Sequence, residues 1–276
     1  MTHLRQRGSA ALRVSRIRPA VALGCALAAI LTPTSGAAQD PFAIEVYGSE
    51  MEASGSWDLG AHFSYAAVGT TAYDGSLAPT EHQGRFALEL TRGVTDSWEV
   101  AAYALMGSRP GAGVENAGWR LRSRVRLPEM PKLAGNVSVG LEVGFYPAAY
   151  GENAIALEIR PIFAKRIGRV EMRLNPAVER GLKGRDTTSA SGWEFEPSAR
   201  VAVSLSQRID LSVEYYGKTA LLDSAVPSGA EVHQFFPGLD LKLGEDIALN
   251  LGVGFGTTSA GNRLVFKSGL DVPLGN

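Results

Sequence analysis

Apolar and polar side chains alternate along most of the chain after residue 56, with a period of two residues. In the first such run Trp57, Leu59 and Phe63 share one face, whereas Asp58 and His62 share the other. This period is typical of a β-strand whose two faces meet different surroundings. The pattern predicts twelve strands, at residues 57–65, 85–91, 98–106, 119–127, 137–146, 154–164, 170–179, 193–205, 209–218, 235–243, 247–256 and 263–274.

The charged residues of these twelve runs separate by face. The runs contain 13 acidic and 12 basic residues, and all of them fall on the face opposite the apolar one. A soluble β-sandwich, with its charged faces in water, would show the same separation. The alternation therefore predicts an all-β protein, but it leaves open whether the apolar face meets a protein core or lipid.

The links between the predicted strands alternate in length. Tight turns occupy residues 95–97, 166–169, 206–208 and 244–246, with a longer one at 128–135. Longer polar loops lie between them, at residues 66–84, 107–118, 148–153, 181–192, 219–234 and 257–262. Turns at one end of the strands and loops at the other are typical of outer-membrane barrels.

Aromatic residues on the apolar face gather at the two ends of the predicted strands. Seven fall at loop ends and three at turn ends: Tyr65, Trp119, Phe145, Trp193, Tyr215, Phe235 and Phe255, then Trp57, Trp98 and Phe163. Such girdles mark the two interfaces of a membrane, and a soluble sandwich has no reason to sort aromatics by height. Residues 57–276 are therefore predicted to form a transmembrane antiparallel β-barrel of about 12 strands, with both termini periplasmic.

The first 38 residues have the layout of a secretory signal peptide. Five arginines and no acid come first, and an apolar run follows at residues 20–31. That run is too short to span a membrane and is followed by Pro33, which disfavours a membrane anchor. Cys25 lies inside the run and not after it, which disfavours a lipoprotein. We expect a signal peptide at residues 1–38 and a short periplasmic segment at residues 39–56.

The chain has 276 residues and a mean hydropathy of zero, which is the average of an ordinary soluble protein. In a barrel, an apolar outer face and a charged inner face give the same average. Without the predicted signal peptide, 22 Lys and Arg stand against 28 Asp and Glu, a net charge of −6. This charge argues against a nucleic-acid partner. The single cysteine lies in the signal peptide, which excludes thiol catalysis and disulfides in the mature chain.

Several segments resemble a known group of proteins. Residues 40–47 (DPFAIEVY), 93–99 (GVTDSWE), 121–126 (LRSRVR) and 250–254 (NLGVG) are similar to uncharacterised proteobacterial outer-membrane β-barrels. More loosely, they resemble the transporter-like barrels named after the meta pathway of phenol degradation. The resemblance implies a place in the outer membrane of a Gram-negative bacterium, among outer-membrane lipid and lipopolysaccharide. It implies no particular solute.

The C-terminal residues 267–274 resemble the signal read by the barrel assembly machinery. They contain a polar residue, a glycine and two spaced hydrophobic residues, although Val272 and Leu274 stand where aromatics are usual. This resemblance implies that the assembly machinery is a partner during biogenesis.

The sharpest group of candidate residues lies on the inward face of one predicted strand, namely Arg120, Arg122, Arg124 and Arg126. Neighbouring strands present Glu99 and Glu142, with Glu158 and Arg160 beyond them. One interpretation is a ladder of positive charge across a pore, which would favour anionic or dipolar solutes. It predicts a narrow passive channel or transporter for small solutes.

The alternative interpretation is a salt-bridge lattice that fills a narrow barrel. Its arginines would bind Glu89, Glu99 and Glu142 with the bidentate geometry that guanidinium groups favour. It predicts a closed structural or surface-binding barrel.

Inward glycines and the residues before the first strand bear on the same question. Gly252 and Gly254 fall on one inward wall, and Gly140 and Gly144 on another. Walls without side chains leave room for water, for long arginines or for a plug. Residues 42–47 also alternate, and would form either a short periplasmic strand or a segment folded into the barrel mouth.

A third class of function is a lipid-modifying outer-membrane enzyme that uses Ser, His and an acid or amide. The mature chain offers His62, His82 and His233 for this role. His62, which shares a face with Asp58, is more simply a buried hydrogen-bonded residue. His82 and His233 lie near loop ends, but no motif such as His-Gly-x-Ser surrounds them. The sequence therefore predicts no enzyme, no cofactor and no metal.

Overall fold

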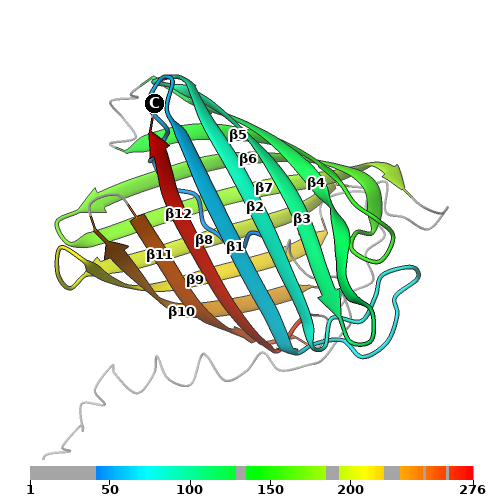
Figure 1. The fold of residues 1–276 in the computed structure, drawn as a ribbon. Helices are drawn as coiled ribbons and strands as arrows, with labels where there is room; N and C mark the ends of the chain where they lie inside the picture. Colours follow the sequence, from blue (N-terminus) through cyan, green and yellow to red (C-terminus); the bar gives the residue numbers. More distant parts are fainter. Residues whose placement is uncertain are drawn as a thin grey trace, which may run out of the picture. The chain divides into compact units, whose positions relative to one another are not determined.

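The computed structural model describes residues 42–128, 135–184, 193–220, 231–244, 247–258 and 261–275. Within these residues, twelve strands form one closed antiparallel barrel (Figure 1). The strands are β1 (Trp57–Val68), β2 (Gln83–Thr95), β3 (Trp98–Arg109), β4 (Gly113–Arg126), β5 (Asn136–Phe145), β6 (Asn153–Ile167), β7 (Val170–Gly184), β8 (Trp193–Ser204), β9 (Ile209–Ala220), β10 (Val232–Leu243), β11 (Ile247–Gly256) and β12 (Leu264–Gly275). This confirms the predicted all-β antiparallel barrel of twelve strands.

The barrel closes where the first strand meets the last. β1 pairs with β12 along its whole length, from Trp57 opposite Gly275 to Val68 opposite Leu264. Every other strand pairs with its neighbours in sequence, so no sheet edge is left open. We call the end where β1 begins and β12 ends the turn end, and the opposite end the loop end.

One predicted loop is wrong. Residues 107–118 were expected to form a long loop, but β3 and β4 extend through them and leave only residues 110–112 as a link. The pattern failed here because a bulge shifts the pairing next to Leu105, where Gly118 has a φ of +121°. A Cβ at Gly118 would lie 2.1 Å from the Phe145 carbonyl oxygen. Such a bulge breaks the period of two on which the sequence argument relied.

The two faces of the sheet differ as the charge separation predicted. Outward leucines and valines are exposed, with Leu121 at 50% and Val213 at 53%. Outward aromatics pair near the loop end, where the Trp119 and Phe145 ring centroids lie 3.8 Å apart. Many charged residues on the inward face are buried, among them Arg122, Glu142 and Lys267. Within the described residues, no helix is long and apolar enough to cross a membrane.

A charge placed on the outer face tests where lipid meets the barrel. Leu121→Arg, in the middle of β4, should lower the free energy of unfolding by about 2–4 kcal/mol, because an arginine at the bilayer midplane is poorly solvated. Ile167→Arg, at the turn end of β6, should cost only about 0–1 kcal/mol. Urea unfolding in lipid vesicles measures both, and equal losses would contradict this placement of the membrane.

Candidate functional site in the barrel lumen

The arginines of β4 lie in the lumen because every second residue of the strand points inward. Arg120, Arg122 and Arg124 are all less than 9% exposed. The register places Arg124 opposite Glu99 on β3, and Arg122 opposite Glu142 on β5. The ladder therefore runs between two strands that carry acids.

Each of these three arginines forms an ion pair with a buried glutamate. Arg122 Nη2 lies 2.7 Å from Glu89 Oε1 and 3.4 Å from Glu99 Oε1. Arg124 Nε lies 3.0 Å from Glu99 Oε1, and Arg120 Nη1 lies 3.1 Å from an oxygen of Glu142. These contacts match the lattice arrangement more closely than an unpaired ladder.

The other residues of the predicted group lie elsewhere in the lumen. Arg126 is at the turn end, where it donates to the Ser49 carbonyl oxygen at 2.8 Å. Glu158 and Arg160 pair with each other along β6, with two contacts of 2.6 Å. Seven of the eight residues thus belong to separate ion-pair groups, and among the described contacts Arg126 bonds only backbone carbonyl oxygens.

A second set of ion pairs was not singled out from the sequence. Arg200 on β8 lies 3.2 Å from Glu171 and 3.6 Å from Glu214, and it also pairs with Asp240. Lys267 on β12 pairs with Glu214. Alternation alone predicted that these side chains point inward. Most of these strands carry few charges, and none draws attention as the arginine run of β4 does.

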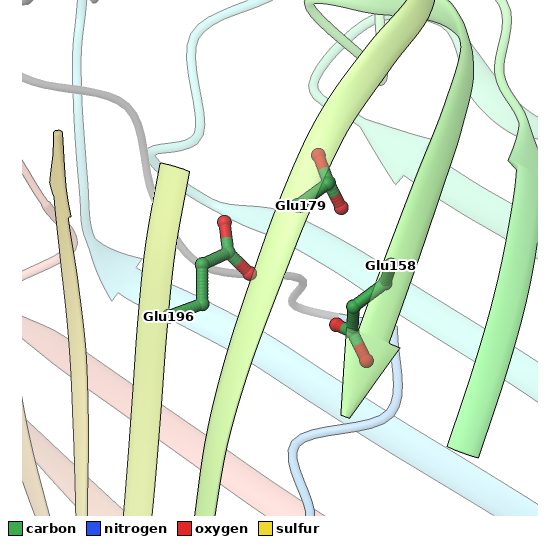
Figure 2. Close-up of side chains that lie close together, drawn as sticks. All are labelled: Glu158, Glu179 and Glu196. Atoms are coloured by element: carbon green, nitrogen blue, oxygen red, sulfur yellow. The ribbon is translucent and has the colours of Figure 1, made fainter. Parts of the chain in front are cut away.

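Three glutamates lie close together on β6, β7 and β8 (Figure 2). One carboxylate oxygen from each of Glu158, Glu179 and Glu196 lies within 4.8 Å of the others. Oxygen donors of this kind can hold a hard cation. Arg160 already binds Glu158, and Lys218 Nζ lies 3.2 Å from Glu196 Oε1. Because these bases supply positive charge beside the glutamates, we interpret the trio as part of the ion-pair lattice.

The residues before β1, here called the lumen segment (residues 42–52), lie inside the barrel (Figure 1). Tyr47 donates its backbone N–H to Asn175 Oδ1 at 2.7 Å, and Asn175 Nδ2 donates to the Tyr47 carbonyl oxygen at 3.0 Å. The guanidinium groups of Arg122 and Arg160 lie 4.7 and 5.1 Å from the centre of the Tyr47 ring. Burial raises the pKa of the Tyr47 phenol above its ordinary value.

The lumen segment begins in the loop half of the barrel and ends at the turn end. Phe42 packs in a buried cluster that includes Ala87 and Leu105 from the loop half of the strands, and Tyr150 from the link between β5 and β6. Val46 packs in another cluster, on the opposite side of the lumen. Of the two arrangements predicted for residues 42–47, the described structure has the folded one, without strand pairing.

Side chains of the barrel wall hold the backbone of the lumen segment. Lys267 Nζ donates to the Ile44 carbonyl oxygen at 2.9 Å, and Arg173 donates to the Val46 carbonyl oxygen at 3.2 Å. Arg124 donates to the carbonyl oxygen of Glu50. The segment therefore uses some of the donors that an empty lumen would present to solutes.

Inward glycines make room for their neighbours on the wall. A Cβ at Gly254 would lie 2.3 Å from the Phe236 ring, and one at Gly144 would lie 2.3 Å from the Tyr146 hydroxyl. These two positions hold aromatic side chains, so they do not leave open space.

The histidines do not come together. His62 Nε2 lies 3.1 Å from Glu89 Oε2 in the lumen, as expected of a buried hydrogen-bonded residue. His82 Nδ1 bonds the Tyr65 hydroxyl, and His233 Nδ1 bonds the Tyr215 hydroxyl. Since β11 and β12 lie between these two pairs in the barrel, His82 and His233 share no metal site.

A cavity of about 470 Å³ remains at the turn end. The lumen segment forms part of its wall, and residues from every strand except β5 form the rest. The wall of the cavity also includes Asp58, near the start of β1, and Asp271, near the end of β12. Its volume falls within the range of small-molecule sites in proteins.

A closed twelve-stranded barrel with an apolar outer face and a charged lumen has the architecture of outer-membrane barrels. It is similar to an outer-membrane channel from Pseudomonas putida F1, with a TM-score of 0.60 over 84% of this chain and 100% of that one, at 12% identity. It is also similar to the NanC porin, with a TM-score of 0.53 over 78% of this chain and 97% of that one, at 9% identity.

A third similar structure is the KdgM porin, with a TM-score of 0.51, 6% identity, and coverage of 78% of this chain and 97% of that one. No family model matches the chain, and no curated protein matches its sequence. At these identities the likeness shows the fold, which is that of outer-membrane channels and porins. The resemblance drawn from the sequence is confirmed at that level.

Removing one member of a buried ion pair tests the lattice. Arg122→Leu should lower the free energy of unfolding by about 3–5 kcal/mol, because Glu89 and Glu99 lose a buried partner. Arg126→Leu, which removes bonds to carbonyl oxygens at the turn end, should cost about 0.5–1.5 kcal/mol per bond. Urea unfolding of the purified protein measures both changes, and the idea of a stabilising lattice fails if the two variants lose the same amount.

Proposed function

We propose that the protein is an outer-membrane channel for small solutes, narrowed by its own lumen segment. The observation that carries this proposal is the lumen segment itself, a stretch of chain without strand pairing inside a lumen lined by charged side chains. The fold shared with an outer-membrane channel and two porins supports the proposal.

Hydrogen bonds and buried side chains, and not strand pairing, hold the lumen segment in the barrel. Tyr47, Ile44 and Val46 are held by hydrogen bonds from the wall, each worth about 0.5–1.5 kcal/mol net. Phe42 and Val46 add buried apolar surface, worth about 1.5–3 kcal/mol for each side chain. Water can replace most of these hydrogen bonds when the segment leaves, whereas the strands keep their pairing.

The same proposal includes the route and orientation of the chain. Residues 1–38 act as an export signal, and the barrel assembly machinery reads the C-terminal residues of β12. The turn end, where β1 begins and β12 ends, faces the periplasm. Outer-membrane lipid and lipopolysaccharide then surround the exposed apolar face.

A second candidate is a closed structural barrel, and the density of buried ion pairs favours it. The pairs of Arg122, Arg200 and Lys267 stiffen the wall whether or not solutes pass. Conductance is the property that separates the two candidates.

Loosening the lumen segment tests the channel. Asn175→Ala removes both side-chain hydrogen bonds to the Tyr47 backbone, so the segment should leave more often. In planar bilayers the full chain should give small single-channel steps, and Asn175→Ala should give larger or longer ones.

The matched control is Asn136→Ala, which removes the same side chain at the exposed start of β5. Its steps should equal those of the unchanged protein. Folding of each variant is checked by heat-modified gel mobility. If folded protein and folded Asn175→Ala both give no steps, the channel proposal is overturned and the closed barrel is favoured.

A further inference from the structure

The charges around the turn-end cavity are unequal. Eleven carboxylate side chains and six Lys or Arg side chains line it, together with His62. With the carboxylates ionised and His62 neutral, this is a surplus of five negative charges. The strands contribute eight of these carboxylates and all six bases, and the lumen segment adds the other three carboxylates, Glu45, Glu50 and Glu52.

Most basic side chains of the cavity already form ion pairs with glutamates. Each of its five arginines forms an ion pair with at least one glutamate in the described structure. Three of them, Arg166, Arg173 and Arg200, pair with the same residue, Glu171. Arg124 and Arg173 also donate to carbonyl oxygens of the lumen segment. Only Lys242, exposed at the turn-end rim, has no ion pair among the described contacts.

Several acids of the cavity have no such base. Among the described contacts, no ion pair with Lys or Arg involves Glu45, Asp58 or Asp271, and the same holds for Glu52 and Asp210. Asp58 and Asp271 come from the paired strands β1 and β12, and Glu45 comes from the lumen segment that faces them. Negative charge is therefore uncompensated on one side of the cavity.

Gly60 lies beside two side chains that line this part of the cavity, His62 and Asp271. A Cβ on Gly60 would lie 3.1 Å from His62 Nε2 and 3.3 Å from Asp271 Oδ1. A side chain at position 60 would crowd both of them, so the glycine allows His62 and Asp271 to lie close together at the cavity wall. A small cation can approach Asp271 from the cavity without displacing an existing basic partner.

From this geometry we infer that the turn-end cavity binds small organic cations and makes the channel cation-selective. The inference rests on the proposed channel for its selectivity, but the binding site stands on the cavity alone. It also reverses the expectation drawn from the arginine run, because those arginines are neutralised by glutamates. A unit charge at 4 Å in water changes the local concentration of a counter-ion about fivefold.

The selectivity test is the reversal potential of the full chain in planar bilayers under a KCl gradient. Potassium should permeate better than chloride, and Asp58→Asn with Asp271→Asn should lower the permeability ratio several-fold. Asp74→Asn, in the exposed link between β1 and β2 and outside the cavity, should leave the ratio unchanged. Equal or greater chloride permeability in the unchanged protein overturns the inferred selectivity.

The binding test needs no current. Putrescine should raise the Tm of the detergent-solubilised full chain, because a ligand that binds only the folded state stabilises it. Two molecules with the same four-carbon chain, neutral 1,4-butanediol and anionic succinate, should not. The double variant should lose the putrescine shift, whereas Asp74→Asn should keep it.

The outcomes separate the two proposals. A putrescine shift without any conductance overturns the channel and leaves the cation site standing. Conductance without a potassium preference and without a putrescine shift overturns the cation site and leaves the channel standing. A putrescine shift that survives in the folded double variant overturns the assignment to Asp58 and Asp271.

Discussion

A strand in lipid has no water to bond its backbone, so every N–H and C=O must find a partner within the protein. In this barrel the pairing of β1 with β12 meets that requirement, because it removes the last open edge. Closure also sorts the side chains. Alternate residues must face lipid or lumen, which is why one face of each strand is apolar and the other carries the charges.

The enclosed charges then face a constraint of their own. A buried ion without a partner is costly, and the lumen meets this cost with pairs such as Arg122 with Glu89 and Lys267 with Glu214. The lumen segment also supplies partners for buried charges, since its carbonyl oxygens accept hydrogen bonds from Arg124, Arg173 and Lys267. Five acids that form no ion pair with Lys or Arg among the described contacts line the turn-end cavity.

Strand number and inward direction could be predicted from the sequence because both follow from one local period. The extent of β3 and β4 could not, because the bulge at Gly118 breaks that period for a backbone reason. Partners of Arg122 were predictable, since Glu89 and Glu99 lie on the two preceding strands. The bonds of Asn175 and Lys267 to the lumen segment were not, because they join residues more than one hundred positions apart. Counting charges strand by strand also did not show that carboxylates outnumber bases at the turn end of the lumen.

The lumen segment has a consequence for the order of assembly. It precedes the first strand, yet it lies inside a ring that only the last strand completes. Lys267, which binds its backbone, belongs to that last strand. The segment must therefore either wait inside an unfinished sheet until β12 arrives, or enter afterwards through the turn end. In both cases its final contacts form only after the whole chain has been delivered to the membrane.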